Sequence, residues 1–133
     1  DLISGDLDVS EVPGVWNDKM EEYLGVRPDT DAEGCLQDIH WTNGAIGYFP
    51  TYTLGSVLAA QLDHHLRADV GDVDSLVREG EFEPIHDWLT ENVHRHGARY
   101  ETDDLIRQAT GEAFTADHFL RYADEKYRAL YDC

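Results

Sequence analysis

The stretch TYTLGSVLAAQLDHHLRAD, residues 51–69, decides the fold class of this chain. Side chains suited to a buried stripe recur in it at three- and four-residue spacing, the period of one face of an α-helix. They are Leu54, Val57, Leu58, Gln61, Leu62, His65 and Leu66. Pro50 and Thr51 favour a helix start there, and Gly71 favours a helix end. The stretch therefore predicts one long amphipathic helix.

The same period continues on both sides of this helix. It recurs in residues 12–24, 73–78, 82–97, 102–110 and 116–131. The expected helix starts are Ser10, Thr102 and Thr115, and the expected stops are Gly25, Gly97 and Gly111. Within 82–97 the inward residues are expected to be Phe82, Ile85, Trp88, Leu89 and Val93. No segment alternates apolar and polar residues over the length of a strand, so we predict an all-α fold.

Length and composition limit the number of domains that the chain can form and the class of protein to which it belongs. With 133 residues and 41% hydrophobic content, the chain can bury one modest core, and we expect residues 1–133 to form a single helical unit. No apolar run is long enough to span a membrane, and the first residues lack the pattern of a signal peptide. Cys35 and Cys133 make no disulfide framework. These features favour a soluble, cytoplasmic protein.

The charge balance excludes some partners. Asp and Glu number 28 against 10 Lys and Arg, which gives a formal net charge of -18. Such a surface repels phosphate groups, so we expect neither nucleic acid nor an anionic membrane as a partner. Only Lys19 and Lys126 are lysines. An Asp-rich, Lys-poor surface indicates adaptation to high salt, the alternative being an ordinary acidic cytosolic protein.

Histidine is a common metal ligand, so the spacing of the histidines bears on metal binding. There are seven, but no H-E-x-x-H motif, which would place two ligands on one helical face. His64 and His65 are adjacent, so they should point to different sides of their helix. The HRH at 94–96 suits a helix end, and the EPIH at 83–86 is one copy of a unit that di-metal bundles use twice. The residues therefore predict no metal site in this chain.

Motifs for nucleophilic or nucleotide chemistry are also missing. The sequence has no G-x-S-x-G and no glycine-rich phosphate loop, and Cys35 shows no independent sign of activation.

The passage GCLQDIHWTNGAIGYFPTYTLG, residues 34–55, carries the chemistry that the helices do not explain. Gln37, Asp38 and His40 offer an amide, a carboxylate and an imidazole within four residues, and the carboxylate could orient the ring. The wall around them would come from Trp41, Tyr48, Phe49 and Tyr52. Glycines and Pro50 would hold an irregular backbone path. Both a binding-site loop and a packed aromatic corner have this make-up.

A resemblance adds to this interpretation. GCLQDIHW, residues 34–41, fits the pattern G-x-x-Q-D-x-H-W at every fixed position, and it resembles the motif of the carboxypeptidase Taq family of metal-dependent carboxypeptidases. GYFPTYTLG at 47–55, DWLTENVHRHGARY and the closing FLRYADEKYRALY also look like that family. The resemblance covers essentially the whole chain. It implies the C-terminal part of a largely helical, commonly homodimeric enzyme that is several times longer.

The resemblance also implies where the metal lies. Such enzymes bind zinc or cobalt through the two histidines of H-E-x-x-H and a downstream glutamate, and the glutamate between the histidines activates a metal-bound water that attacks the C-terminal peptide bond. These groups lie upstream of the matched segment. We therefore expect no catalytic residue, no metal ligand and no cofactor in this chain, which begins at Asp1 like a fragment and should be inactive without its missing N-terminal portion.

In the longer enzyme the motif is implied to line the active-site groove. Its residues would bind substrate or support the metal site: Gln37, Asp38, His40 and Trp41, with Tyr48 and Tyr52 as further candidates. The peptide substrate would be the partner of the full enzyme. The alternative is a free-standing helical module that acts by interaction or dimerisation. Either way, apolar surface left exposed should favour a homo-oligomer.

Overall fold

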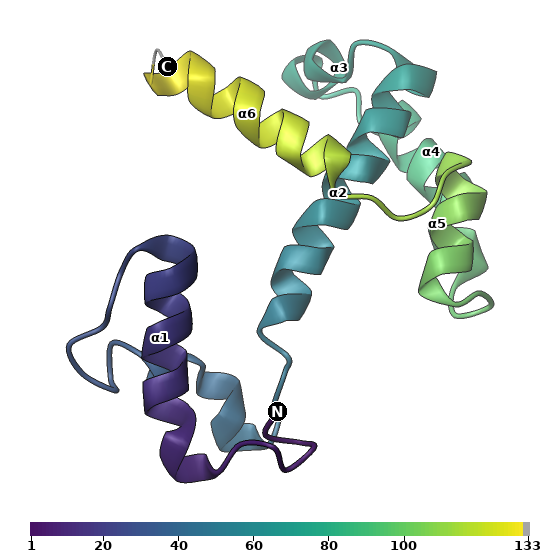
Figure 1. The fold of residues 1–133 in the computed structure, drawn as a ribbon. Coiled ribbons are helices and arrows are strands. Elements are labelled where there is room, and N and C mark those ends of the chain that lie inside the picture. Colours follow the sequence, from purple (N-terminus) through teal and green to yellow (C-terminus); the bar gives the residue numbers. More distant parts are fainter. Residues whose placement is uncertain (132–133) are drawn as a thin grey trace. The chain divides into compact units, whose positions relative to one another are not determined.

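The computed structural model describes residues 1–131, and every regular element within them is helical (Figure 1). The α-helices are α1 (Val12–Leu24), α2 (Pro50–Val70), α3 (Val73–Glu79), α4 (Glu83–Asn92), α5 (Thr102–Thr110) and α6 (Asp117–Tyr131). Four 3₁₀ turns accompany them: η1 (Val9–Glu11), η2 (Cys35–Gln37), η3 (Ile39–Asn43) and η4 (His94–His96). No strand occurs within 1–131, so the all-α prediction is confirmed.

The chain divides into two compact units, and each is described by itself. Unit 1 is Asp1–Pro50 and unit 2 is Thr51–Cys133. Unit 1 contains η1, α1, η2 and η3, whereas unit 2 contains nearly all of α2 and the helices that follow it. The expectation that residues 1–133 act as one helical unit stays a prediction.

The start of α1 differs from the prediction. Ser10 was expected to cap the helix, but α1 has no side-chain cap at its start. Asp8 caps the preceding 3₁₀ turn η1 instead, where its carboxylate accepts from the Ser10 backbone N–H at 2.8 Å. Glu11 completes a capping box by accepting from the Asp8 backbone N–H at 2.9 Å. The end is as predicted, because Gly25 has φ 69°, the left-handed conformation that glycine adopts without strain.

The core of unit 2 joins α2, α3 and α4. Leu66, Val73 and Trp88 are buried together, and four partly buried residues pack against them: Leu62, Val70, Ile85 and Leu89. Burying one such side chain contributes about 1.5–3 kcal/mol, so these contacts hold the three helices together. The indole of Trp88 also donates to Asp69 at 2.8 Å.

Phe82 is a correction to the predicted core. It was expected to face inward, but it is 57% exposed. The reason is positional: Phe82 is the residue before α4, and Pro at the first turn starts the helix at Glu83. The inward stripe therefore begins at Ile85.

A buried glutamine attaches the segment before α6 to α2. Gln61 is 0% exposed; its Nε2 donates to the Ala113 carbonyl at 3.0 Å and its Oε1 accepts from the Thr115 backbone N–H at 3.1 Å. Thr115 was predicted to cap α6; its hydroxyl accepts from the Asp117 N–H at 3.2 Å, but Ala116 is the residue directly before the helix and its carbonyl accepts from the Leu120 N–H. Helix α6 itself contains no buried residue. Its attachment therefore rests on partly buried contacts and on polar groups at its start.

Many large hydrophobic side chains remain exposed, as expected. On α6 they are Leu120, Tyr122, Tyr127, Leu130 and Tyr131, and unit 1 exposes Ile3, Val9, Tyr23 and Leu24 among others. Surface of this kind is typical of a face that packs against another element. Whether the chain self-associates stays a prediction.

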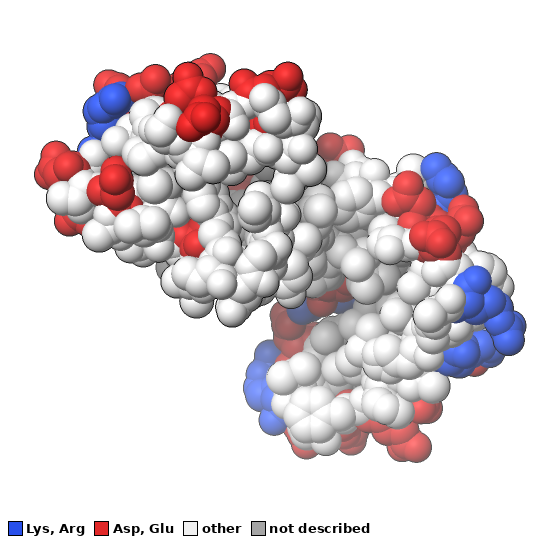
Figure 2. Space-filling view, turned by 90° about the horizontal axis from the view of Figure 1, so that it is seen from below, with Lys and Arg blue, Asp and Glu red and all other residues white. Residues whose placement is uncertain are grey.

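Acidic residues dominate the charged surface. In the view of Figure 2 they are spread over the visible face, and Lys and Arg form smaller groups among them. None of the helices in residues 1–131 is long and apolar enough to cross a membrane. Cys35 is a buried free thiol, and Cys133 lies outside the described residues.

Candidate functional site

The centre of the predicted motif is the carboxylate of Asp38, which is only 5% exposed. It lies between η2 and η3 and caps the latter, with the His40 backbone N–H donating to it at 3.1 Å. His40 Nδ1 lies 2.7 Å from the same oxygen, and Trp41 Nε1 donates to the other oxygen at 2.5 Å. One side chain thus fixes its own turn and two aromatic rings.

The protonation of this cluster follows from its hydrogen bonds. Burial alone would raise the pKa of Asp38, but the hydrogen bonds from the His40 ring, the His40 backbone and Trp41 outweigh it, and the pKa lies below its ordinary value of 3.8. The carboxylate is therefore ionised at neutral pH and can only accept. The proton between it and the imidazole must then lie on His40 Nδ1, which donates to the carboxylate.

Aromatic rings surround the histidine. The His40 ring centroid lies 5.0 Å from that of Tyr48 in a tilted arrangement and 5.8 Å from that of Phe49 edge to face. Trp41 meets Trp16 of α1 edge to face, with centroids 6.2 Å apart. The predicted aromatic wall thus forms around His40 and Trp41, and Trp16 joins it.

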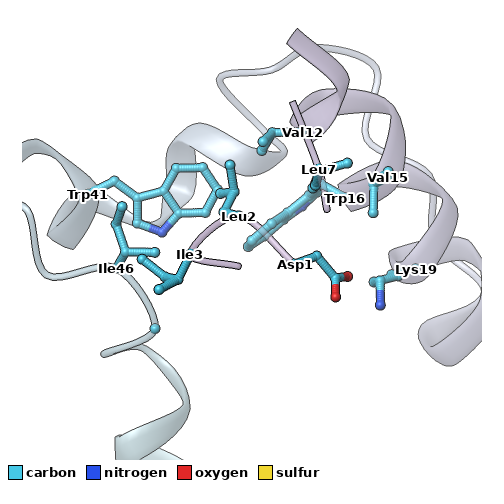
Figure 3. A pocket seen from close by; sticks show the side chains of 11 residues that line it. Asp1, Leu2, Ile3, Leu7, Val12, Val15, Trp16, Lys19, Trp41 and Ile46 are labelled. Carbon is cyan, nitrogen blue, oxygen red and sulfur yellow. The ribbon is translucent and has the colours of Figure 1, made fainter. Parts of the chain in front are cut away.

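Trp41 also borders an apolar hollow of about 320 Å³ in unit 1. Figure 3 shows Trp41 and Ile46 on one side of it, Trp16 and Lys19 of α1 on the other, and Leu2 between them. The Trp16 indole N–H is buried and has no hydrogen-bond partner within residues 1–131. Trp16 was missed as a site residue because its spacing in α1 fits a core stripe equally well.

Glycines shape the backbone after the motif. Gly44 ends η3 with φ 72°, and its N–H donates to the Trp41 carbonyl at 3.0 Å. Gly47 follows with φ 79°. Both conformations are ones that residues with a Cβ rarely adopt, so the irregular path predicted for this loop is present.

Gln37 points away from the Asp38 carboxylate, and Tyr52 belongs to the other unit. The Gln37 side chain is exposed and donates to the backbone carbonyl of Ala32 in its own loop. Tyr52 is 57% exposed and lies in the first turn of α2, in unit 2. Within unit 1 the structure therefore brings together Asp38, His40, Trp41 and Tyr48. Their roles in binding or support stay predictions.

A second group of ligand-type side chains was not anticipated. His65, Glu112 and His118 of unit 2 place their ligand atoms within 4.8 Å of one another. His64 and His65 were expected to diverge, yet both rings lie close to His118, with centroids 4.3 Å and 5.8 Å away. His118 lies in the first turn of α6 and forms a triangle of rings with them, since the His64 and His65 centroids are 5.2 Å apart. No sequence signal indicates this group, because 47 positions separate His65 from Glu112.

The ligand set implied by the resemblance is not present in this chain. The 133 residues contain no H-E-x-x-H. The only group within residues 1–131 that could hold a metal is His65, Glu112 and His118, which come from three separate segments. No step of peptide hydrolysis can therefore be assigned to a metal held by the implied set.

Comparison with known proteins agrees with the motif. The profile of the carboxypeptidase Taq (M32) metallopeptidases matches residues 1–127. Thermostable carboxypeptidase 1 of Pyrococcus furiosus is 46% identical over 126 residues, which are 95% of this chain and 25% of the relative. Carboxypeptidase 1 of Bacillus subtilis is 46% identical over 130 residues, 98% of this chain and 26% of the relative.

A solved structure shows the same fold. Metallocarboxypeptidase 1 of Trypanosoma cruzi aligns with a TM-score of 0.86 at 45% identity, covering 96% of this chain and 27% of the other. The chain thus spans about a quarter of the length of the relatives it matches. With the family profile covering nearly all of its length, the chain belongs to the carboxypeptidase Taq (M32) metallopeptidase family.

Proposed function

We propose that this chain is the C-terminal part of a metal-dependent carboxypeptidase, which hydrolyses the C-terminal peptide bond of peptides. The proposal is supported by membership of the family and by identities near 46% to carboxypeptidases of which the chain spans a quarter. In this role the chain supplies residues that position the substrate. The zinc or cobalt ion and the general base come from the N-terminal portion.

The observation that carries the positioning role is the convergence of His40 and Trp41 on one buried carboxylate. Asp38 holds the imidazole and the indole by hydrogen bonds of 2.7 and 2.5 Å, so neither ring can turn without breaking a bond to a charged group. A ring held in this way can meet a peptide group in one orientation, which removes part of the entropy cost of reaching the transition state. In this proposal Asp38 positions His40 and Trp41, and the two rings contact the substrate.

Gln37, Tyr48 and Tyr52 have lesser roles in the proposal. Tyr48 lies against the His40 ring and could present its hydroxyl to the same substrate group. Gln37 is engaged with its own loop, so it would act by holding the loop before the motif. Tyr52 would contribute from the start of α2.

Activity should depend on the rest of the enzyme. A chimera in which this chain replaces the matching 130 residues of the Bacillus subtilis carboxypeptidase should hydrolyse a blocked dipeptide, whereas the isolated chain should not. Hydrolysis by the isolated chain, with its mass verified, would contradict the proposal that the metal ion and the general base come from the N-terminal portion. A chimera that folds and binds metal but hydrolyses nothing would reject the proposed contribution of this part.

The exposed side chains of α6 favour a packing partner, and two are proposed. One is the N-terminal portion of the same enzyme and the other is a second copy, since a homo-oligomer is expected. In the isolated chain the first partner is absent, so light scattering should show self-association. The free-standing interaction module would instead form a defined oligomer and would not restore activity in the chimera.

The acidic surface is proposed to be an adaptation to high salt in a cytoplasmic protein. Its support is the net charge of -18 with only two lysines. Cations screen repulsion between carboxylates within a few ångströms at molar concentrations. The melting temperature should therefore rise as KCl is raised into the molar range, and a flat or falling melting temperature would reject this adaptation.

A further inference from the structure

The carboxylate of Glu112 gathers two histidines that lie far from each other in the sequence. His65 Nε2 lies 2.9 Å and His118 Nε2 lies 2.6 Å from the same oxygen, Oε1. His65 comes from α2, Glu112 follows the end of α5, and His118 lies in the first turn of α6. Three segments thus direct nitrogen and oxygen ligand atoms at one point.

The chemistry of this set is that of a transition-metal site. Two imidazole nitrogens and one carboxylate oxygen suit Zn²⁺ and its neighbours, whereas Mg²⁺ and Ca²⁺ prefer oxygen ligands alone. Without a metal, protons on the two imidazole nitrogens take its place between the ligands. The carboxylate then accepts from two N–H groups, which is the arrangement seen here. We propose that His65, Glu112 and His118 form a binding site for a divalent cation of the zinc type.

The fit requires only a small movement. Metal–ligand bonds of about 2.1 Å in a tetrahedral site place the ligand atoms roughly 3.4 Å apart. The two separations from Glu112 Oε1 are 2.6 and 2.9 Å. Each must therefore open by less than an ångström. The two histidine nitrogens lie within 4.8 Å of each other and must settle at the same separation. Glu112 lies in the short connection between α5 and α6.

The surroundings hold the ligands in place. Gln61 Nε2 donates to Glu112 Oε1 at 3.2 Å and fixes the carboxylate from within α2. His64 stacks on the His118 ring with centroids 4.3 Å apart, and the His118 side chain is only 10% exposed. Three protein ligands leave one tetrahedral position, which a water molecule would fill.

One feature limits the affinity. A metal-bound histidine usually donates its second ring nitrogen to an acceptor, and losing that partner weakens binding by about 10–100-fold. The His118 Nδ1 atom is buried without a hydrogen-bond partner in residues 1–131. We therefore expect binding weaker than in a fully supported zinc site.

The consequence of binding would be structural. Helix α6 has no buried residue, so a metal that joins His118 to His65 would clamp the start of α6 to α2. This role requires only residues of unit 2, and it would hold whether or not the longer protein is a peptidase. It departs from the sequence-based expectation of no metal in this chain.

The test is a titration of the metal-free 133-residue chain with Zn²⁺, followed by calorimetry and by the His ring signals in NMR spectra. We expect one Zn²⁺ per chain, with shifts at His65 and His118. His118→Ala and Glu112→Gln should each weaken binding at least tenfold. The control His86→Ala/His94→Ala removes a surface pair whose rings are 6.5 Å apart and should leave binding unchanged.

Circular dichroism of each variant verifies that the helices persist, and Glu112→Gln preserves the shape of the side chain if His118→Ala unfolds. Absence of stoichiometric binding by the wild-type chain would overturn the proposal by itself. So would equal binding by Glu112→Gln, or loss of binding in the control, because either outcome would place the ion elsewhere.

Discussion

Each unit of this chain contains one carboxylate that gathers aromatic rings, and the two carboxylates differ in how far along the sequence those rings lie. In unit 1, Asp38 holds His40 and Trp41, which lie within three positions of it. In unit 2, Glu112 holds His65 and His118, which lie 47 and 6 positions away. The local cluster fixes the shape of one loop, whereas the long-range cluster joins separate helices. A sequence motif can thus predict a cluster whose residues are neighbours in the chain. A cluster whose residues are far apart in the chain is visible only in the folded structure.

The largest expected effect comes from breaking the local cluster. Asp38→Ala leaves the His40 ring, the His40 backbone N–H and the Trp41 indole without their acceptor. A hydrogen bond to a charged group contributes about 1.5–3 kcal/mol, so we expect a loss of about 3 kcal/mol in the free energy of unfolding of unit 1. Fluorotryptophan NMR resolves Trp41 of unit 1 from Trp88 of unit 2 and can follow each unit separately.

The control for this variant is Asp29→Ala, which removes an exposed aspartate from the same unit. It should leave the Trp41 signal and the unfolding midpoint within experimental error. Equal destabilisation by both variants would mean that the loss reflects charge alone and not the Asp38 hydrogen bonds.

The second largest loss of stability is expected from a substitution of Gln61, which supports the long-range cluster. Gln61→Leu keeps the side-chain volume but leaves the Ala113 carbonyl and the Thr115 N–H without a side-chain partner. An unsatisfied buried polar group costs about 1–3 kcal/mol, so we expect a loss of about 2 kcal/mol, reported by Trp88. If the leucine variant were as stable as the wild type, the attachment of α6 would have to rest on apolar contacts.

A smaller effect is expected where the same segment enters α6. Thr115→Ala removes the hydroxyl that accepts from the Asp117 N–H, and losing one hydrogen bond of this kind costs about 1 kcal/mol. Thr115→Ser retains the hydroxyl and should recover most of the stability. Failure of serine to recover it would assign the effect to the threonine methyl group.

The smallest expected effect is the change with pH in the stability that Asp38 contributes to unit 1. The folded pKa of Asp38 lies below the ordinary value of 3.8, so its contribution to stability is present above about pH 4 and declines as pH falls through the folded pKa. The stability difference between wild type and Asp38→Asn should therefore shrink on acidification, measured by denaturant unfolding of unit 1. A difference that stayed constant would mean that Asp38 is equally ionised in the folded and unfolded states.

The helices were predictable because their signals are local. The helix over residues 51–69 and the glycine stops at Gly25 and Gly111 depend only on neighbouring positions, and the structure has them. Within the predicted stripe Val57, Gln61 and Leu66 are buried, whereas Leu54 is 53% exposed. The errors occurred at helix boundaries. The helix predicted over residues 82–97 ends at Asn92 as α4, and the 3₁₀ turn η4 lies between it and Gly97. Ser10 was predicted as the cap, although Asp8 and Glu11 form the capping box. Phe82 was predicted to face inward from a helix that begins one residue after it.

The sites were predictable to different degrees for the same reason. The carboxylate, imidazole and indole of the motif are close in sequence, so their contact could be inferred from residues 37–41 alone. The approach of His118 to His65 depends on where the loop after Gly111 directs α6, and no local pattern encodes that direction. Trp16 was not anticipated because an indole on a helix stripe indicates a core as readily as a site.

The most direct test of the central claim is the effect of His40→Ala on kcat/KM in the chimeric carboxypeptidase, with His86→Ala of the exposed α4 surface as the matched control. We predict at least a tenfold loss for His40→Ala, equivalent to about 1.4 kcal/mol of transition-state stabilisation, with the fold and the bound metal retained. The control should remain at the level of the unmodified chimera. Unchanged kinetics in His40→Ala would contradict the account and would make the Asp38 cluster a purely structural feature of the loop.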